Sequence, residues 1–178
     1  MEGCGELMVE GLSGMLEDCK LDKDTTIKLL QGAYVAIDGL WFMSVEKVHG
    51  YDEALKMDLE VWSSWVQILC KRIKRVTGIE GDDLLSIVKV IKFASEIEGS
   101  DFEVVEMGDN RAVLRCANCR WYENLKKAGR TDRVPCDEIE EAIWPSFAKA
   151  LNPKMQVKQL KSMPRGDESC DFLVEIKE

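Results

Sequence analysis

Four of the chain's seven cysteines lie in its last third, in a pattern that one metal ion could organise. Cys116 and Cys119 form a C-x-x-C pair, and Cys136 and Cys170 follow at wider spacings. Two thiolates three positions apart at a turn can hold one ion, and two further thiolates brought in by the fold would complete a tetrahedral sulfur shell. These four cysteines are therefore the candidate metal ligands, with zinc favoured and an iron–sulfur cluster as the alternative.

Two other interpretations of the same cysteines stay open. The second pair is not a C-x-x-C, so the match to a zinc ribbon is partial, and reduced structural thiols without a metal would also account for it. A redox-active pair made by Cys116 and Cys119 is the other interpretation, because the start of a helix stabilises a thiolate. That interpretation leaves Cys136 and Cys170 without a role.

Polar residues on the expected long helices form a second group of candidates. Glu46 and His49 are three positions apart, so both side chains lie on one helical face, where they could act as a catalytic general base. With Asp58 they could also hold one metal ion. A di-iron bundle is not expected, because it needs a second Glu-x-x-His pair and the chain has one histidine. A histidine packed at the end of a helix is the structural alternative.

Asp38 and the tryptophans around it are candidates for binding a ligand. A carboxylate beside apolar residues on a helix must be solvated, paired or functional. We predict that Asp38, Trp41, Asp58 and Trp62 contact a small molecule in a cavity between two helices, with Trp65 beside them. An aromatic stripe at helical spacing is also typical of a hydrophobic core, and this alternative stays open.

Three helices are expected to position the residues of the front half. Apolar residues recur at steps of three and four, which predicts amphipathic helices over about 22–50, 52–78 and 82–97. Asp22 or Asp24 is the expected N-cap of the first helix, and Gly50 its expected C-cap. The basic run 71–75 suits the last turn of the second helix.

The back half changes to the period of β-strands. Alternating residues predict strands over 102–107, 111–116, 155–160 and 172–176, with helices over 118–127 and 136–150 between the two strand pairs. The fold class is therefore α+β: a layer of about three helices followed by a ββααββ antiparallel-sheet subdomain. We expect a mobile N-terminus (1–21), a helical subdomain (22–99) and a cysteine-rich α+β subdomain (100–178), the last two packed as one compact domain.

Composition narrows the classes of partner. The 178 residues are 46% hydrophobic and 32% charged, which supports a real core. A net charge of −9 disfavours nucleic acids and anionic membranes. The start resembles no signal peptide and no apolar run spans a bilayer, so we expect a cytoplasmic protein, where clustered cysteines indicate metal ligands or redox thiols before disulfides. A small molecule is the expected partner, and a homodimer would cover an exposed edge strand or tryptophan-rich face.

Several of these residues carry a resemblance to known families. The cysteines Cys116, Cys119 and Cys136, together with the closing segment 166–172 (GDESCDF), make the back half resemble the L-2-amino-thiazoline-4-carboxylic acid hydrolase family. More distantly, this half is similar to the vinyl-4-reductase type of small-molecule-binding domain. The front half resembles a group of uncharacterised cytosolic proteins from anaerobes, on residues 38–42 (DGLWF) and on Glu46, His49, Gly50, Ala54, Asp58 and Trp62.

The resemblance implies a ligand set and, less directly, a reaction. The ligand set is the four cysteines named above, and the reaction is ring-opening hydrolysis of a cyclic C–N bond in a sulfur heterocycle. The favoured function is thus a cytosolic metal-binding and small-molecule-binding protein without assigned activity. A hydrolase of the thiazoline-carboxylate type and a C-x-x-C thiol redox protein are the alternatives, and the sequence does not decide whether the protein is an enzyme.

Overall fold

The computed structural model describes residues 20–177, so the mobile N-terminus predicted for 1–21 lies almost wholly outside the described residues. The architecture is α+β, as predicted: three helices come first, and a four-stranded antiparallel sheet with two helices between its strand pairs follows. Within the described range, none of the helices combines the length and the apolar character needed to cross a membrane.

The helical layer consists of α2 (Lys23–His49), α3 (Tyr51–Thr77) and α4 (Leu84–Glu98). Asp22 caps α2 by accepting a hydrogen bond from the Thr25 backbone N–H, which decides between the two predicted caps. Gly50 ends α2 at a φ of 88°, a left-handed value that favours glycine, and the chain turns there directly into α3. The three predicted helices are confirmed.

The sheet confirms the predicted ββααββ order. Its strands are β1 (Asp101–Met107), β2 (Arg111–Asn118), β3 (Met155–Lys161) and β4 (Cys170–Ile176), and the connecting helices are α5 (Arg120–Ala128), α6 (Cys136–Leu151) and the short 3-10 helix η1 (Met163–Arg165). The strands lie in the order β1-β2-β4-β3, and every neighbouring pair is antiparallel. The last strand is thus central, beside β2.

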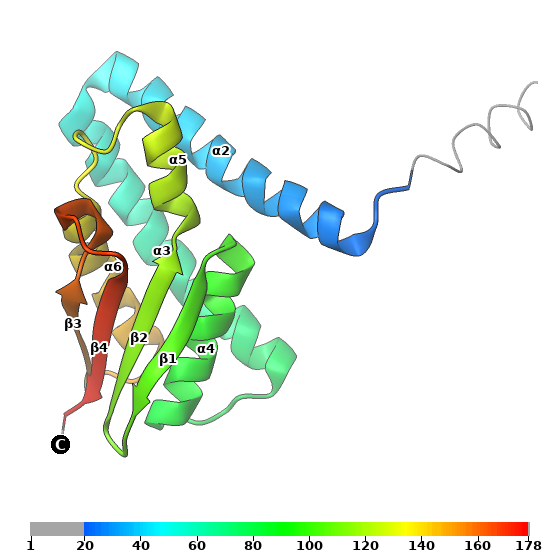
Figure 1. Cartoon of the computed structure of the whole chain (residues 1–178), viewed down its shortest axis with the longest axis vertical. Helices are drawn as coiled ribbons and strands as arrows, with labels where there is room; N and C mark the ends of the chain where they lie inside the picture. Colours follow the sequence, from blue (N-terminus) through cyan, green and yellow to red (C-terminus); the bar gives the residue numbers. More distant parts are fainter. Residues whose placement is uncertain (1–19, 178) are drawn as a thin grey trace, which may run out of the picture.

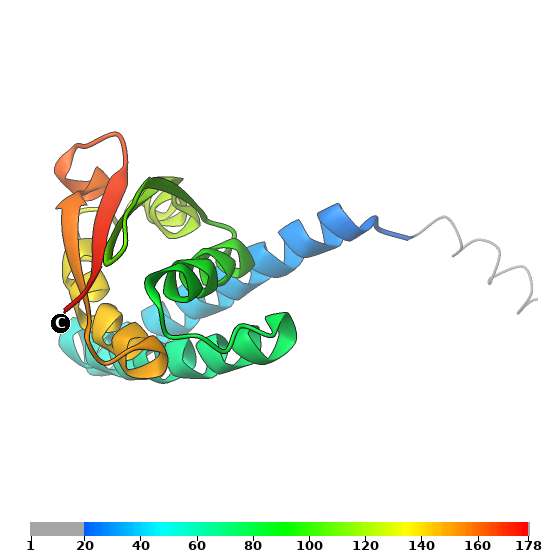
Figure 2. The same ribbon diagram turned by 90° about the horizontal axis from the view of Figure 1, so that it is seen from below.

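The hydrophobic core lies between the sheet and the helices α3, α4 and α6, which stack on one side of it (Figure 2). Ala112 and Leu114, which alternate along β2, point into this core together with Phe172 of β4 and Ile87 of α4, and Cys116, the next residue in the alternation, is also buried. Cys70, interpreted above as a small core residue, is fully buried in the same cluster.

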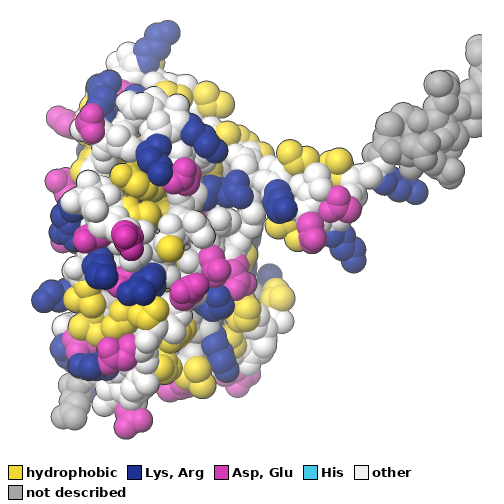
Figure 3. Space-filling model, in the orientation of Figure 1, with side chains coloured by type: hydrophobic (Ala, Val, Ile, Leu, Met, Phe, Trp, Pro, Cys, Tyr) yellow, Lys and Arg dark blue, Asp and Glu magenta, His cyan; other side chains and the backbone are white. Residues whose placement is uncertain are grey.

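The N-terminal half of α2 extends away from the rest of the molecule (Figure 1). Hydrophobic side chains line this arm in the space-filling view (Figure 3), and many apolar residues of the helix are exposed, including Ile27, Leu30, Ile37, Leu40, Trp41 and Val48. Only Val35 and Phe42 of α2 are buried. The packing of α2 is therefore confined to a narrow strip of its surface.

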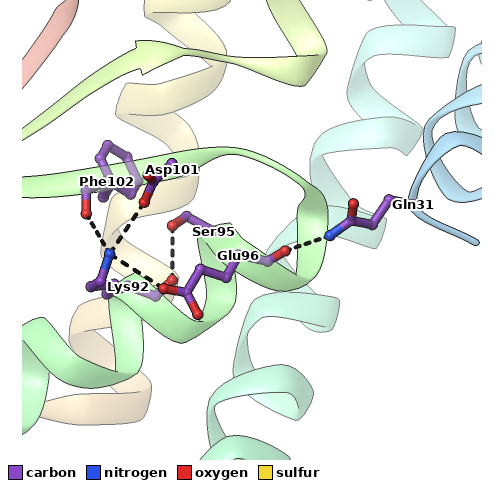
Figure 4. Close-up of polar contacts among 6 residues, drawn as sticks. All are labelled: Gln31, Lys92, Ser95, Glu96, Asp101 and Phe102. Atoms are coloured by element: carbon purple, nitrogen blue, oxygen red, sulfur yellow. Dashed lines mark hydrogen bonds and ion pairs between the residues drawn. The ribbon is translucent and has the colours of Figure 1, made fainter. Parts of the chain in front are cut away.

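Polar contacts at the end of α4 join it to both of its neighbours (Figure 4). The side-chain amide of Gln31 donates to the backbone oxygen of Glu96 at 2.7 Å, which fixes α2 against α4. On the other side, Lys92 donates to the Asp101 carboxylate at 3.2 Å and to the Phe102 carbonyl at 3.0 Å, which fixes α4 against β1. The end of α4 is thereby placed where α2 and the start of α5 meet.

Candidate functional site

Seven side chains gather where α2, α3, α4 and α5 meet, and we call them the acidic aromatic cluster: Tyr34, Asp38, Asp58, Trp62, Trp65, Glu98 and Trp121. The helical period brings Tyr34 and Asp38 to one face of α2, and Asp58, Trp62 and Trp65 to the facing side of α3. Glu98 is the last residue of α4, and Trp121 lies in the first turn of α5.

The rings of the cluster pack edge to face. Trp62 and Trp121 have ring centroids 5.0 Å apart at an interplanar angle of 87°, and Tyr34 lies 5.8 Å from Trp62 and 6.0 Å from Trp121. Trp65 completes the group, with its centroid 6.3 Å from that of Tyr34. This arrangement directs the positive ring edges at neighbouring ring faces, so the rings form a stable wall around the carboxylates.

Two of the three carboxylates accept hydrogen bonds from indole N–H groups. Trp62 Nε1 donates to Asp38 Oδ1 at 3.1 Å, and Trp121 Nε1 donates to Glu98 Oε2 at 3.4 Å. Asp58 is 7% exposed, and its Oδ1 atom is buried with no hydrogen-bond partner among the described residues. Within the same range, none of the three carboxylates forms an ion pair with lysine or arginine.

Burial without a cation favours the protonated form of these carboxylates. Burial, and then the neighbouring charge of Asp38, raises the pKa of Asp58 to about 7, against the lowering effect of the nearby Trp62 indole N–H. Burial also raises the pKa of Glu98 to about 7, against the lowering effect of the hydrogen bond from Trp121. The pKa of Asp38 is raised for the same reason, although its bond from Trp62 opposes the shift. The cluster can therefore hold or release protons near neutral pH.

Further polar atoms of the cluster also lack partners. Tyr34 Oη and Trp65 Nε1 are buried without a hydrogen bond to the described residues. Buried polar groups are nearly always paired in native proteins, and each unpaired group lowers the stability of the fold. Together with Asp58 Oδ1, the cluster thus contains both a buried acceptor and buried donors without a hydrogen-bond partner among the described residues.

The structure brings together three of the four residues predicted to contact a ligand. Asp38, Asp58 and Trp62 belong to the cluster, whereas Trp41 is 41% exposed on α2 and lies outside it. Tyr34 also belongs to the cluster and was not predicted, although it is one helical turn before Asp38. Glu98 and Trp121 were not predicted either, because no local signal marks them and their proximity to α2 arises from the tertiary fold.

The four candidate metal ligands form a second group, which we call the thiol cluster. Cys116 and Cys170 are partners in the register of β2 and β4. Cys119 is the N-cap of α5, and its Sγ accepts a hydrogen bond from the Tyr122 backbone N–H at 3.4 Å. Cys136 is the first residue of α6. The Sγ of Cys170 accepts from the backbone N–H of Met163 at 3.3 Å. Cys119, Cys136 and Cys170 thus lie at the ends of elements, as predicted, whereas β2 continues past Cys116 to Asn118.

The pKa shifts of the four thiols indicate that they lie close to one another. The interaction with Cys119, followed by burial, raises the pKa of Cys116. The same interaction, together with the backbone N–H groups at the start of α5, lowers the pKa of Cys119 to about 6. Burial and then the charge of Cys119 raise the pKa of Cys136 to about 12. Burial raises the pKa of Cys170 to about 11, against the lowering effect of the hydrogen bond from the Met163 backbone N–H, and the charge of Cys119 adds to the rise.

The described side chains do not, however, form a ready metal site. Across residues 20–177, no group of three or more His, Cys, Asp or Glu side chains is arranged so that it could hold a metal ion. This also applies to the trio of Glu46, His49 and Asp58 considered above. As they stand, the thiols fit a reduced, hydrogen-bonded pair with two further thiols close by, and a metal would require them to reorient.

Glu46 is held by two arginines rather than by the histidine with which it was paired in the sequence analysis. Arg130 Nη2 lies 2.7 Å from Glu46 Oε2, and Arg133 Nη2 lies 3.0 Å from Oε1. Both carboxylate oxygens are engaged, and the contacts tie the end of α2 to the segment after α5. His49 is exposed, and no hydrogen bond between it and Glu46 is found in the described part of the chain. This geometry gives Glu46 a structural role and leaves the proposed general base without support.

Solved structures of other proteins share the fold. The phenol-responsive sensory domain of the transcription activator PoxR, solved with phenol, has a TM-score of 0.57 at 12% identity, over 80% of this chain and 73% of that chain. A trafficking protein particle complex subunit 3 from Naegleria fowleri, covalently bound to palmitic acid, has a TM-score of 0.56 at 14% identity, over 85% and 97% of the two chains. The H-NOX domain SO2144 from Shewanella oneidensis, in its Fe(II)CO state, reaches 0.45 at 17% identity, over 77% and 74%.

At these identities, the first two structures establish a shared fold and nothing more, and the third is too dissimilar to carry an argument. No curated protein matches the sequence. A family model matches residues 19–174, which is most of the chain, including both clusters described above. The chain therefore belongs to the family of unknown function DUF6125.

Proposed function

We propose that this chain binds a small molecule at the acidic aromatic cluster and acts as a ligand-binding domain rather than as an enzyme. The observation that carries the proposal is the buried, unpartnered Oδ1 of Asp58 beside two further carboxylates. Burying such a group without compensation costs several kcal/mol. Violations of this kind are typical of functional sites, where a ligand supplies the missing partner.

The cluster is accessible from the surface. Tyr34, Asp38, Trp62 and Trp121 are half-buried, so part of each of these side chains faces solvent. Two proteins that share the fold are known with bound small molecules, namely phenol in one and palmitic acid in the other. They support ligand binding as a use of this fold, although the chemistry of their ligands does not transfer to this chain.

Tryptophan indole signals in a nuclear magnetic resonance spectrum test the proposal. The chain has five tryptophans, each with one indole N–H signal that a Trp→Phe variant assigns. We would titrate phenol, benzyl alcohol, benzylamine and benzoate separately. At least one is expected to shift the signals of Trp62 and Trp121, with Trp41 and Trp144 as internal controls. If none of the four moves Trp62 or Trp121, or if only the signals of the controls move, the site is wrong.

The thiol cluster supports a second proposal, a structural zinc. The supporting observations are the register pairing of Cys116 with Cys170 and the two backbone N–H···Sγ bonds, which suit thiolates. Zinc held by Cys116, Cys119, Cys136 and Cys170 would cross-link the ends of four elements. Four thiolate ligands leave no open coordination position, so such a site would stabilise the fold without catalysing a reaction.

Elemental analysis and a visible spectrum of protein purified without oxygen test the second proposal. One zinc per chain without colour supports it, and Cys170→Ser should then lower the zinc content whereas Cys70→Ser, in the core, should not. A brown protein with iron and sulfide would instead indicate the iron–sulfur alternative. Protein without metal would contradict both, and reactive Cys116 and Cys119 in a thiol titration would then favour the redox interpretation.

The remaining expectations from the sequence stay predictions. Hydrolysis of a cyclic C–N bond, implied by the resemblance to the thiazoline-carboxylate hydrolase family, would be tested by assaying cyclic amidines with the wild type and with a Glu46→Gln, His49→Ala double variant. A homodimer would cover the exposed apolar residues of α2 and would be seen by sedimentation velocity. The cytoplasmic location also remains a prediction.

A further inference from the structure

We infer that the ligand of the acidic aromatic cluster is a small organic ammonium ion, and that one of its N–H groups donates a hydrogen bond to Asp58 Oδ1. This inference rests on the proposed function and adds the chemical class of the ligand. Three features of the cluster support it: its charge, its aromatic rings, and the hydrogen-bond acceptor that is left free.

The charges around the cluster leave its Asp58 end without a cation. Two arginines approach the cluster elsewhere. Arg72 stacks on the ring of Trp65 with its guanidinium carbon 5.4 Å from the centroid, and Arg120 lies over Gly99, next to Glu98. Neither forms an ion pair with a cluster carboxylate in the described structure. Asp38 on α2 and Asp58 on α3 therefore repel each other when both are ionised, because no ion pair with a cation compensates them. A cation on the ligand would offset this repulsion between the two carboxylates.

The rings favour a cation over a neutral group. The faces of tryptophan and tyrosine attract cations within about 6 Å of the ring centroid. Arg72 already uses Trp65 in this way on one side of the cluster. Tyr34 and Trp62, with ring centroids 5.8 Å apart, lie beside Asp38, and Asp38 is close enough to Asp58 for its charge to act there, so an ammonium group at the aspartates would have aromatic rings beside it. A carboxylate ligand would be repelled from the same position.

The free hydrogen-bond acceptor, Asp58 Oδ1, determines which kind of organic ligand the site favours. Trp62 Nε1 is directed to Asp38 Oδ1, whereas Asp58 Oδ1 has no partner. A primary or secondary ammonium ion can donate an N–H to this oxygen, and a charge-assisted bond of this kind is stronger than a bond between neutral groups. A quaternary ammonium ion has no N–H, and a neutral alcohol supplies a donor without the charge. The site therefore favours a protonated amine over both.

Calorimetric titration at pH 8 with three probes of similar shape tests the inference. The probes are benzylamine, benzyl alcohol and benzyltrimethylammonium, added to wild-type protein and to Asp58→Asn. We expect benzylamine to bind at least about tenfold more tightly than the other two, a difference of about 1.4 kcal/mol. Asp58→Asn should remove this advantage. Glu60→Gln, which changes an exposed carboxylate on the same helix, is the matched control and should leave the affinity unchanged.

The outcomes separate the inference from the proposed function. If benzyl alcohol binds as tightly as benzylamine and shifts the Trp62 signal, the ligand class is wrong and the site stands. If benzyltrimethylammonium binds as tightly and Asp58→Asn has no effect, the role of Asp58 is wrong. If no probe binds and the Trp62 signal does not move, both fail. If Asp58→Asn does not fold, the pH dependence of the wild type tests the inference instead. The affinity of the wild type for benzylamine should be lower at pH 5 than at pH 8, and an equal affinity at both pH values would overturn the inference.

Discussion

Two buried aspartates in two regions of the molecule have opposite surroundings. Asp171, on β4 in the sheet, is 3% exposed and accepts hydrogen bonds from Arg115 Nε at 3.0 Å, Arg115 Nη2 at 2.8 Å and Ser169 Oγ at 2.7 Å. Asp58, between the helices, is 7% exposed and has an unpartnered Oδ1. The bonds from Arg115 lower the pKa of Asp171, whereas burial raises that of Asp58 to about 7.

This difference separates a carboxylate whose buried charge the fold compensates from one whose buried charge it leaves uncompensated. At Asp171 the chain provides a bidentate cation and a hydroxyl, so the buried charge is compensated within the fold. At Asp58 the chain provides neither, and the compensation must come from a proton or a ligand. The Asp171 carboxylate in the sheet thus contributes to the stability of the fold, whereas the Asp58 carboxylate in the acidic aromatic cluster lowers it.

The largest effect is expected in the core beside Asp171. Phe172 is 2% exposed and packs against Trp144 and Phe102, with ring centroids 5.3 Å and 5.8 Å away. Phe172→Ala should lower the free energy of unfolding by about 3–5 kcal/mol, because it removes buried area and leaves a cavity. Urea unfolding measures this loss. Val104→Ala, on the exposed side of β1, is the control and should change stability by less than about 0.5 kcal/mol.

Asp171→Asn should lower the free energy of unfolding by about 2–3 kcal/mol, because Arg115 loses its charged partner in a buried setting. The loss is smaller than for a fully buried pair, since the Arg115 side chain is 37% exposed. The control is Glu175→Gln, which removes the exposed pair with Lys177 and should cost about 0–1 kcal/mol. An equal effect of the two variants in chemical unfolding would show that Asp171 is not a special position.

Glu46→Gln should lower the free energy of unfolding by about 1–3 kcal/mol, because Arg130, whose side chain is 16% exposed, loses its anion. His49→Ala should stay within about 0.5 kcal/mol, since His49 is exposed. Thermal unfolding of the two variants would separate them. A large loss in His49→Ala would contradict the structural role assigned to Glu46 alone and restore the pair as a unit.

Asp58→Asn should raise stability by about 1–2 kcal/mol at pH 8 and have little effect at pH 4. The pKa of Asp58 is about 7 in the folded state and 3.8 for an ordinary aspartate, so between these values the folded state binds more protons than the unfolded state. The free energy of unfolding of the wild type therefore falls as pH rises from about 4 to about 7. Urea unfolding of both proteins across this range measures the effect, and a variant that is less stable at pH 8 would contradict it.

The fold could be predicted in detail from the sequence, because its signals are local. Steps of three and four residues identified the helices, and the Gly108–Asn110 turn between alternating strands identified the first hairpin. The caps Asp22 and Gly50 also follow from residue types that suit only those backbone positions. None of these signals depends on which elements lie side by side in space.

The candidate site could be predicted only in part, because its chemistry depends on contacts between distant segments. Asp38, Asp58 and Trp62 were found because they lie on two consecutive helices that must pack as a hairpin. Trp41 was misplaced because α2 carries apolar residues around much of its circumference, so periodicity does not show which face is buried.

The arginines that engage Glu46 lie 84 and 87 residues further along the chain, a distance over which spacing carries no information. The same limit applies to Glu98 and Trp121. The carboxylate of Glu98 comes from the end of α4, and the indole of Trp121 from α5, and only the packed fold brings them to α2.

Thermal unfolding of the wild type and of Asp58→Asn at pH 8, with and without benzylamine, tests the central claim most directly. We predict that Asp58→Asn unfolds at a higher temperature than the wild type without benzylamine, and that benzylamine raises the unfolding temperature of the wild type alone. This result would mean that Asp58 lowers stability and provides binding. A variant that unfolds at a lower temperature and responds to benzylamine as strongly as the wild type would contradict the claim.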